Sequence, residues 1–194
     1  MMMEFLKVSH YTTLIVLSLV SIFFLCFFYY LFKLFSFKRD NLERAINSIC
    51  YEKIDGLILE SIDGGEILID HLLLTAKGLL IVDIKDVEGN VFAGDKLLDW
   101  SVITDNRRYT FPNPQPALRD RIIAVQRVVK QVPVFGRVLF LKDSQFKKET
   151  PDLVTNLDNL IDDFQEKDKN TTHFKVKAFM PYWDLVIKKA IPNT

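Results

Sequence analysis

The stretch at residues 69–89, IDHLLLTAKGLLIVDIKDVEG, decides the fold of this 194-residue chain. Two aliphatic runs, at 67–74 and 79–85, are separated by Ala-Lys-Gly at 76–78. Runs of this length and composition, broken by a glycine-containing turn, are typical of paired strands. The sequence therefore predicts an antiparallel hairpin here, with further strands on both sides of it.

The hairpin carries Asp70 on its first strand and Asp83 and Lys85 on its second. Side chains alternate between the two faces of a strand, so Asp83 and Lys85 share a face. A charged pair beside a buried aliphatic run is costly unless it is paired or binds a metal ion. A register that sets Asp70 beside Asp83 would bring two carboxylates within reach of one divalent cation. Because hard oxygen ligands suit Mg²⁺, Asp70 and Asp83 are candidate metal ligands.

Lys85 completes this candidate site. It could orient or help deprotonate a metal-bound water, or neutralise charge on a phosphorus under attack. The alternative is a structural ion pair between strands. His71 and His173 have no Cys or Glu partners at metal-ligand spacing, so zinc is not expected. The sequence has no glycine-rich phosphate loop, which argues against a nucleotide cofactor.

The other elements follow from turn signals and apolar periodicity. Helices are predicted at 40–49, from Asn113 and Pro114, from Thr150 and Pro151 to 164, and at 182–190. Strands are predicted at 57–62, 91–93, 98–104, 109–111, 134–141 and 174–179. In this order they predict an α/β domain with a mixed central sheet flanked by helices. The basic residues between Arg119 and Lys130 could follow a phosphate backbone, but a solvated helix face is favoured.

Residues 13–32, TLIVLSLVSIFFLCFFYYLF, form a run of 20 uncharged residues. A helix of this length spans the hydrocarbon core of a bilayer, which predicts a transmembrane helix and a bilayer partner. A buried helix of a soluble protein and a cleaved signal peptide are the alternatives; the bulky residues that end the run disfavour cleavage. Lys33, Lys38, Arg39 and Arg44 follow the run, so the positive-inside rule predicts a single-pass inner-membrane protein with a cytoplasmic C-terminal domain. The predicted division is an anchor at 1–37 and a domain at 38–194.

Charge and cysteine content narrow the class of protein further. The chain has 25 basic and 25 acidic residues, and the part after residue 37 is also nearly neutral. A strongly basic surface for nucleic acid is therefore not expected, and any contact with DNA or RNA would be local. Cys26 and Cys50 are too few for a disulfide framework or a metal cluster.

Several of these features occur together in an order that is found in a known family. They are Ile69-Asp70-His71, the run at 77–85, Gly89, Val91, Gly94, Trp100, and Asn113-Pro114 entering a helix. In this order they resemble the nuclease-related domain (NERD) family of the PD-(D/E)xK superfamily, whose fold is restriction-endonuclease-like. The resemblance covers about residues 40–132.

The resemblance implies a Mg²⁺- or Mn²⁺-dependent nuclease that cleaves DNA or RNA. In that role Asp70 and Asp83 would be metal ligands and Lys85 the catalytic lysine. Glu43 matches an acidic residue that the family carries on its first helix, and would be accessory; capping the helix is the alternative role.

The chain also departs from the family pattern. Asp83 stands where the family usually has Glu, and Leu42 where a glycine commonly precedes the first-helix acid. A glutamine expected in the helix after Asn113-Pro114 is replaced by Ala117, with Gln115 two residues earlier. The alternative function is therefore a catalytically inactive binding or scaffold module at the inner membrane.

Overall fold

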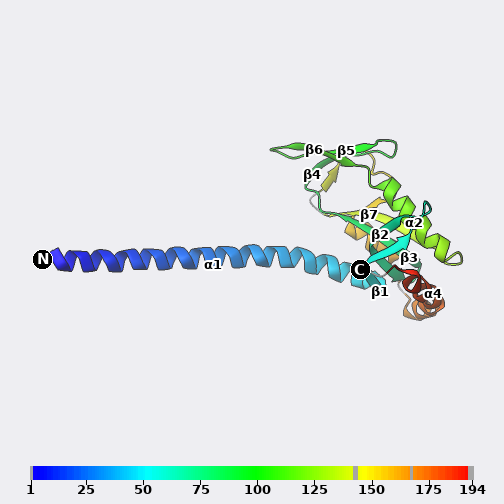
Figure 1. Cartoon of the computed structure of the whole chain (residues 1–194), viewed down its shortest axis with the longest axis horizontal. Helices are drawn as coiled ribbons and strands as arrows, with labels where there is room; N and C mark the ends of the chain where they lie inside the picture. The colour runs from blue at the N-terminus through cyan, green and yellow to red at the C-terminus, as the bar shows by residue number, and fades with distance from the viewer. Residues whose placement is uncertain (1, 142–143, 167, 192–194) are drawn as a thin grey trace. The chain divides into compact units, whose positions relative to one another are not determined.

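The computed structural model describes the backbone of residues 2–141, 144–166 and 168–191. The side chains at 2–16, 18, 32, 34–40, 169 and 170 lie outside the described part. The chain divides into two compact units, Met1–Arg44 and Ala45–Thr194 (Figure 1). The predicted division after residue 37 depended on the membrane segment and stays a prediction.

Helix α1, Met2–Ile49, is continuous. The first 50 residues contain neither glycine nor proline, so nothing in the sequence interrupts the helical hydrogen bonds. The prediction of a separate short helix at 40–49 is therefore wrong: these residues are the end of α1.

The predicted membrane segment at 13–32 falls within α1, and six of its side chains, at 13–16, 18 and 32, are outside the described part. Its described large apolar side chains are mostly exposed, including Phe23 at 68%, Leu25 at 68% and Tyr29 at 67%. In the part of the chain that the structure describes, no helix combines the length and apolar character needed to cross a membrane.

The first sheet contains the predicted hairpin. Its strands, in order across the sheet, are β1 (Cys50–Glu60), β2 (Glu66–Thr75), β3 (Gly78–Lys85), β7 (Val134–Phe140) and β9 (Val154–Thr155). Strands β1, β2 and β3 are antiparallel, whereas β3, β7 and β9 are parallel. The turn between β2 and β3 requires Gly78, which has φ +136° and leaves no space for a Cβ against the Pro133 carbonyl. The predicted hairpin is confirmed.

A second sheet contains four of the strands that follow Lys85. Its order is β6 (Arg108–Pro112), β5 (Asp99–Ile103), β4 (Gly89–Phe92) and β8 (Ser144–Phe146). The prediction of one central sheet is therefore wrong, because Gly89, at φ +114°, lets the chain turn away after β3. Trp100 is fully buried between Phe111 of β6 and Phe140 of β7, and so joins the cores of the two sheets.

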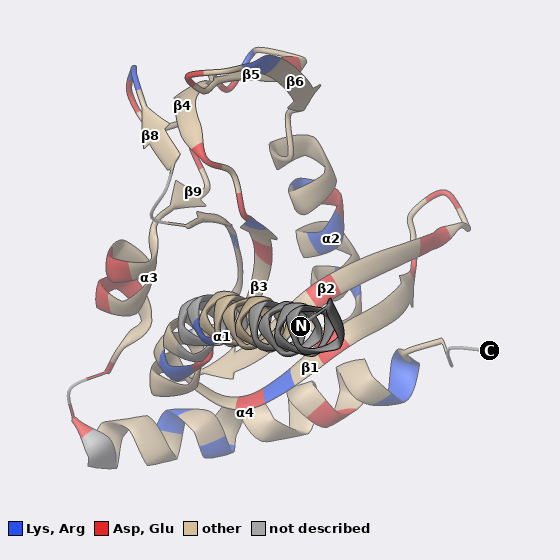
Figure 2. Ribbon diagram, turned by 90° about the vertical axis from the view of Figure 1, so that its left-hand side faces the viewer, with Lys and Arg blue, Asp and Glu red and all other residues tan. Residues whose placement is uncertain are grey.

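Helices cover both faces of the first sheet (Figure 2). Helix α2 (Gln115–Val128) and helix α4 (Lys169–Lys189) share one core with the sheet; that core includes Leu118, Val125, Trp183 and Val186. Helix α3 (Leu157–Phe164) packs on the other face, where the rings of Phe164 and Phe135 are 5.5 Å apart. The fold is mixed α/β, with mixed sheets flanked by helices, as predicted.

Two predicted elements near the C-terminus are wrong. Helix α3 is capped by Asn156 and does not begin at Pro151, because the chain turns at 152–153, with Leu153 at φ +61°, and then forms β9. The predicted strand at 174–179 lies inside α4. The run FKVKAF alternates like a strand, but Val176, Trp183 and Val186 are the buried residues, and their spacing is helical.

Candidate functional site

The candidate site lies at the end of β3, the middle strand of the first sheet. Asp83 is only 4% exposed, and Lys85 Nζ donates a hydrogen bond of 2.8 Å to Asp83 Oδ1. Lys85 keeps about a third of its side chain exposed, at 32%. The two residues are two positions apart on the same strand, so the predicted common face is confirmed.

Asp70 reaches the same face by strand register. In the β2–β3 ladder the last pair toward this end is His71 with Val82, and Asp70 and Asp83 adjoin that pair just beyond the paired part of the ladder. Residues directly opposite in an antiparallel pair project to the same side of the sheet. Asp70 is half-buried. By strand alternation Asp70, Asp83 and Lys85 therefore lie on the same side of the sheet, and the register that would set Asp70 beside Asp83 stays a prediction.

A fourth residue, Arg121 of α2, joins this group. Its Nη1 lies 3.5 Å from Asp83 Oδ2, and its Nε donates a hydrogen bond of 2.7 Å to the Leu68 carbonyl of β2. The sequence interpretation placed Arg121 on a solvated helix face. A signal was present, because Arg121 lies three residues after Leu118 and four before Val125, on the buried stripe of α2.

The carboxylate of Asp83 therefore lies between two cations. Lys85 contacts one oxygen and Arg121 the other. A buried carboxylate loses its hydration, and the paired cations together with the strand environment compensate for that loss. With Asp70 included, the four side chains carry two negative and two positive formal charges.

The donor set suits one kind of metal site. Mg²⁺ is commonly held by one or two carboxylates, and water and substrate phosphate oxygens complete its shell. Asp70 and Asp83 fit that description. Across the described residues, no group of three or more His, Cys, Asp or Glu side chains is arranged to hold a metal ion.

Gln115 serves a different purpose from the family glutamine. It is 1% exposed, donates from Nε2 to Asp95 Oδ1 at 2.8 Å, and also donates to the Asp152 carbonyl. Asn113 Oδ1 accepts from the Gln115 backbone N–H at 3.0 Å. The side-chain oxygen Oε1 of Gln115 is buried and has no hydrogen-bond partner among the described atoms. Gln115 thus ties the start of α2 to two loops, and Ala117 leaves the expected position without an amide.

Two other predicted residues need separate description. Glu43 is on α1, in the unit Met1–Arg44, so its accessory role stays a prediction. His71 faces the opposite side of the sheet from Asp70, and its Nδ1 lies 2.7 Å from Asp55 Oδ1. Burial alone would raise the pKa of Asp55, but hydrogen bonds from His71 and Lys53 outweigh it and hold the pKa below its usual value.

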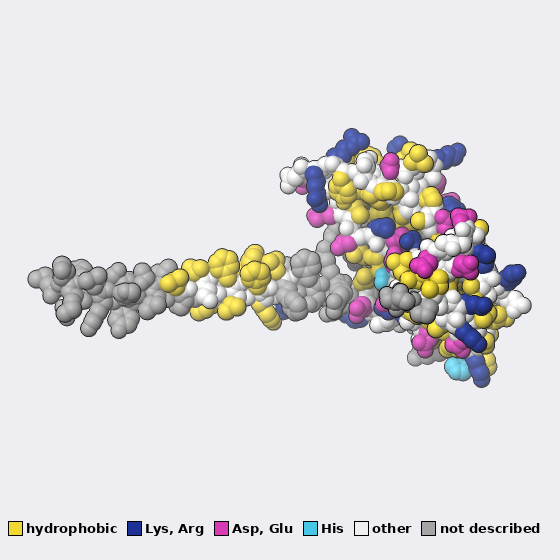
Figure 3. Space-filling model, viewed as in Figure 1, with side chains coloured by type: hydrophobic (Ala, Val, Ile, Leu, Met, Phe, Trp, Pro, Cys, Tyr) yellow, Lys and Arg dark blue, Asp and Glu magenta, His cyan; other side chains and the backbone are white. Residues whose placement is uncertain are grey.

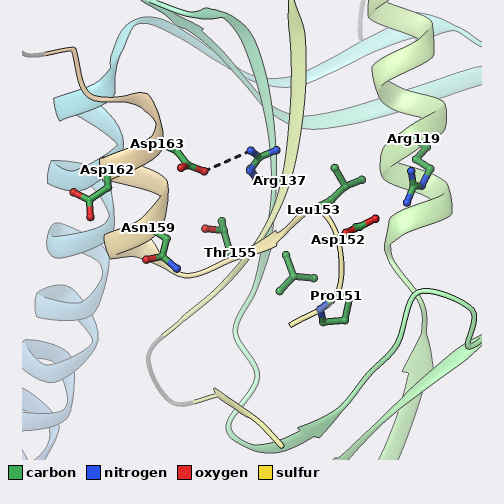
Figure 4. Close-up of a pocket in the computed structure, with 10 residues that line it drawn as sticks. Arg119, Arg137, Pro151, Asp152, Leu153, Thr155, Asn159, Asp162 and Asp163 are labelled. Carbon is green, nitrogen blue, oxygen red and sulfur yellow. Dashed lines mark hydrogen bonds and ion pairs between the residues drawn. The ribbon is translucent and has the colours of Figure 1, made fainter. Parts of the chain in front are cut away.

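A pocket of about 550 Å³ lies at the β9 edge of the first sheet (Figure 4). Arg119 of α2 and Arg137 of β7 line it, and Arg137 Nη2 lies 3.5 Å from Asp163 Oδ2. Arg137 pairs with Val82 in the β3–β7 ladder, so its side chain is on the face opposite to Asp83. The pocket is therefore separate from the candidate site.

Comparison with known proteins gives one match. The family model described as the nuclease-related domain (NERD) matches residues 38–141, which is more than half of the chain. The matched segment contains β1 to β7, α2 and the four residues Asp70, Asp83, Lys85 and Arg121. No curated protein and no solved structure matches the chain.

Proposed function

The chain belongs to the nuclease-related domain family, and on that premise we propose that its C-terminal domain cleaves DNA or RNA phosphodiester bonds with the help of Mg²⁺ or Mn²⁺. The observation that carries this proposal is the hydrogen bond of 2.8 Å from Lys85 to Asp83, with Asp70 on the neighbouring strand next to the last β2–β3 pair, His71 with Val82. Two carboxylates and a lysine on one sheet face are the groups that metal-assisted hydrolysis of a phosphodiester requires.

Each residue has a distinct role in the proposed reaction. Asp70 and Asp83 would hold the ion, which when bound activates a water and offsets charge on the phosphate. Lys85 donates one N–H to Asp83, and its ammonium group has two more donors. With these Lys85 can orient the attacking water or donate to a phosphoryl oxygen as negative charge develops there.

An inactive binding module is the second candidate function. Two observations favour it: Arg121 already contacts the Asp83 oxygen that Lys85 leaves, and Gln115 is engaged by Asp95 and Asp152. In this version the domain would retain the fold and hold nucleic acid or a protein partner without cleavage.

Cleavage by the full chain in detergent separates the two functions. We expect DNA or RNA to be cut in Mg²⁺ or Mn²⁺, and Asp83→Ala or Lys85→Ala to abolish the cut. Lys53→Ala and Asp55→Ala are matched controls, because Lys53 and Asp55 form a similar pair on β1, at 3.2 Å, outside the candidate site. Absence of cleavage on every substrate, together with absence of metal binding, would exclude the enzyme.

We also propose that residues 13–32 attach the protein to the inner membrane, with the domain in the cytoplasm. The proposal is supported by the 20 uncharged residues and by the exposed apolar side chains of α1. It predicts that the full chain stays with membranes after alkaline carbonate washing. Release of the chain by that wash would contradict an inserted segment.

A further inference from the structure

We propose that Arg121 is a built-in counter-ion, which holds the free oxygen of Asp83 until a divalent cation and a phosphodiester arrive together. The inference depends on the proposed metal site and concerns how that site is controlled. It starts from the two contacts of Arg121, to Asp83 Oδ2 and to the Leu68 carbonyl.

Those contacts direct the guanidinium to Asp83. The Nε hydrogen bond to Leu68 is short, at 2.7 Å, and Leu68 is on β2, two residues before Asp70. The Arg121 side chain is only 19% exposed. Arg121 is thus anchored through Nε on β2, and its Nη1 is directed to a carboxylate on β3. These two strands carry both proposed metal ligands.

Arg121 and a bound cation would compete for the same carboxylate oxygen of Asp83. Lys85 already donates to Oδ1 of Asp83, at 2.8 Å, so Oδ2 is the oxygen on which a cation would bind. Arg121 Nη1 faces that same oxygen at 3.5 Å, longer than an ideal charge-assisted hydrogen bond. The guanidinium therefore neutralises Oδ2 through charge, but its contact is weak enough to be exchanged.

Charge balance indicates when the exchange takes place. Asp70, Asp83, Lys85 and Arg121 together are formally neutral, so a divalent cation alone leaves the site with two positive charges. A phosphodiester brings one negative charge, and its two free oxygens match the fork of donors on a guanidinium. Arg121 could then move from Asp83 to the phosphate, which would leave Asp83 Oδ2 available as a metal ligand.

Binding of the two ligands must therefore be coupled. If Arg121 opposes the cation and favours the phosphodiester, each ligand raises the affinity for the other by the same factor. Removing the arginine should increase affinity for the cation alone and should reduce that mutual effect to the direct attraction between the cation and the phosphodiester.

The test measures Mn²⁺ binding by electron paramagnetic resonance, with the full chain in detergent and with or without dimethyl phosphate, a phosphodiester that resists hydrolysis. We expect Arg121→Gln to bind Mn²⁺ about tenfold more tightly than the unchanged chain, within the usual range of such couplings. Dimethyl phosphate should tighten Mn²⁺ binding more in the unchanged chain than in Arg121→Gln. Arg119→Gln, which removes the same charge two residues away on α2, should behave like the unchanged chain.

Arg121→Lys keeps the charge in case the glutamine variant does not fold, and it is too short to span Leu68 and Asp83, so an intermediate affinity is expected. Equal Mn²⁺ affinity in Arg121→Gln, Arg121→Lys and the unchanged chain would overturn the counter-ion role and leave the metal site intact. Absence of Mn²⁺ binding in every chain, Arg121→Gln included, would remove the proposed metal site and the counter-ion role with it.

Discussion

Two lysine–aspartate pairs lie on the first sheet, and each joins residues two positions apart on one strand. Lys53 and Asp55 are on β1, at the edge of the sheet, with the Asp55 side chain 50% exposed. Asp83 and Lys85 are on β3, in the middle, with the Asp83 side chain 6% exposed. Charged side chains are distributed over the face of the molecule that Figure 3 shows. The same residue types therefore differ in their surroundings, and burial and neighbours decide which pair is a candidate for chemistry.

The largest expected difference between the pairs is in stability. Asp83→Ala leaves Lys85 and Arg121 without their shared carboxylate in a mostly buried place, which should cost about 3–5 kcal/mol of unfolding free energy. Asp55→Ala removes a half-exposed carboxylate, and should cost less than about 1 kcal/mol. Urea unfolding of the full chain in detergent, followed by circular dichroism of the sheet, measures both. Equal losses would show that burial does not distinguish the pairs.

The turns before β2 and β3, the strands that carry Asp70 and Asp83, provide a second contrast. Gly78→Ala should cost about 2 kcal/mol or more, because φ +136° is unfavourable for alanine and the new Cβ meets the Pro133 carbonyl. Gly64, between β1 and β2, has φ +78° and open space, so Gly64→Ala should cost about 1 kcal/mol.

The same unfolding measurement reports the Gly78 and Gly64 variants. We expect Gly78→Ala also to weaken Mn²⁺ binding, since the turn sets the register of Asp70 and Asp83. A Gly64→Ala variant that binds Mn²⁺ as weakly as Gly78→Ala would contradict this local effect.

The smallest expected effect is a pH response of the edge pair. The pKa of Asp55 is lowered by His71 and Lys53 against the opposing effect of burial. A carboxyl whose folded-state pKa is depressed stabilises the protein above its unfolded pKa of about 3.9, and that stabilisation is lost as the pH falls through the folded value. His71→Ala should therefore move the pKa of Asp55 upward, which carboxyl-carbon NMR titration measures. An unchanged Asp55 pKa would mean that the His71 contact is not formed in solution.

The local sequence pattern was sufficient to predict features formed by residues that are close together in the chain. The hairpin of β2 and β3 and the common face of Asp83 and Lys85 were predicted, because strand alternation and a glycine turn determine them. The helical segment at 174–179 was not, since its alternating letters fit a strand until Val176 packs with Trp183 and Val186.

Features that depend on distant contacts could not be predicted. The second sheet needs β4 to pair with β8, more than fifty residues later. The contact of Arg121 with Asp83 needs α2 to pack on β3, although the position of Arg121 on the buried stripe gave a usable signal. Gln115 was recognised as displaced, but its bonds to Asp95 and Asp152 depend on two loops distant in sequence.

The hydrogen bonds of Gln115 extend beyond the segment that the family model matches. The family match ends at residue 141, yet Gln115 donates to the Asp152 carbonyl and Val138 of β7 donates its N–H to the Leu153 carbonyl at 2.8 Å. A chain cut at the family boundary would leave β7 as an unpaired sheet edge and remove α4 from the core. The segment that identifies the family is thus shorter than the segment that completes the first sheet and its core.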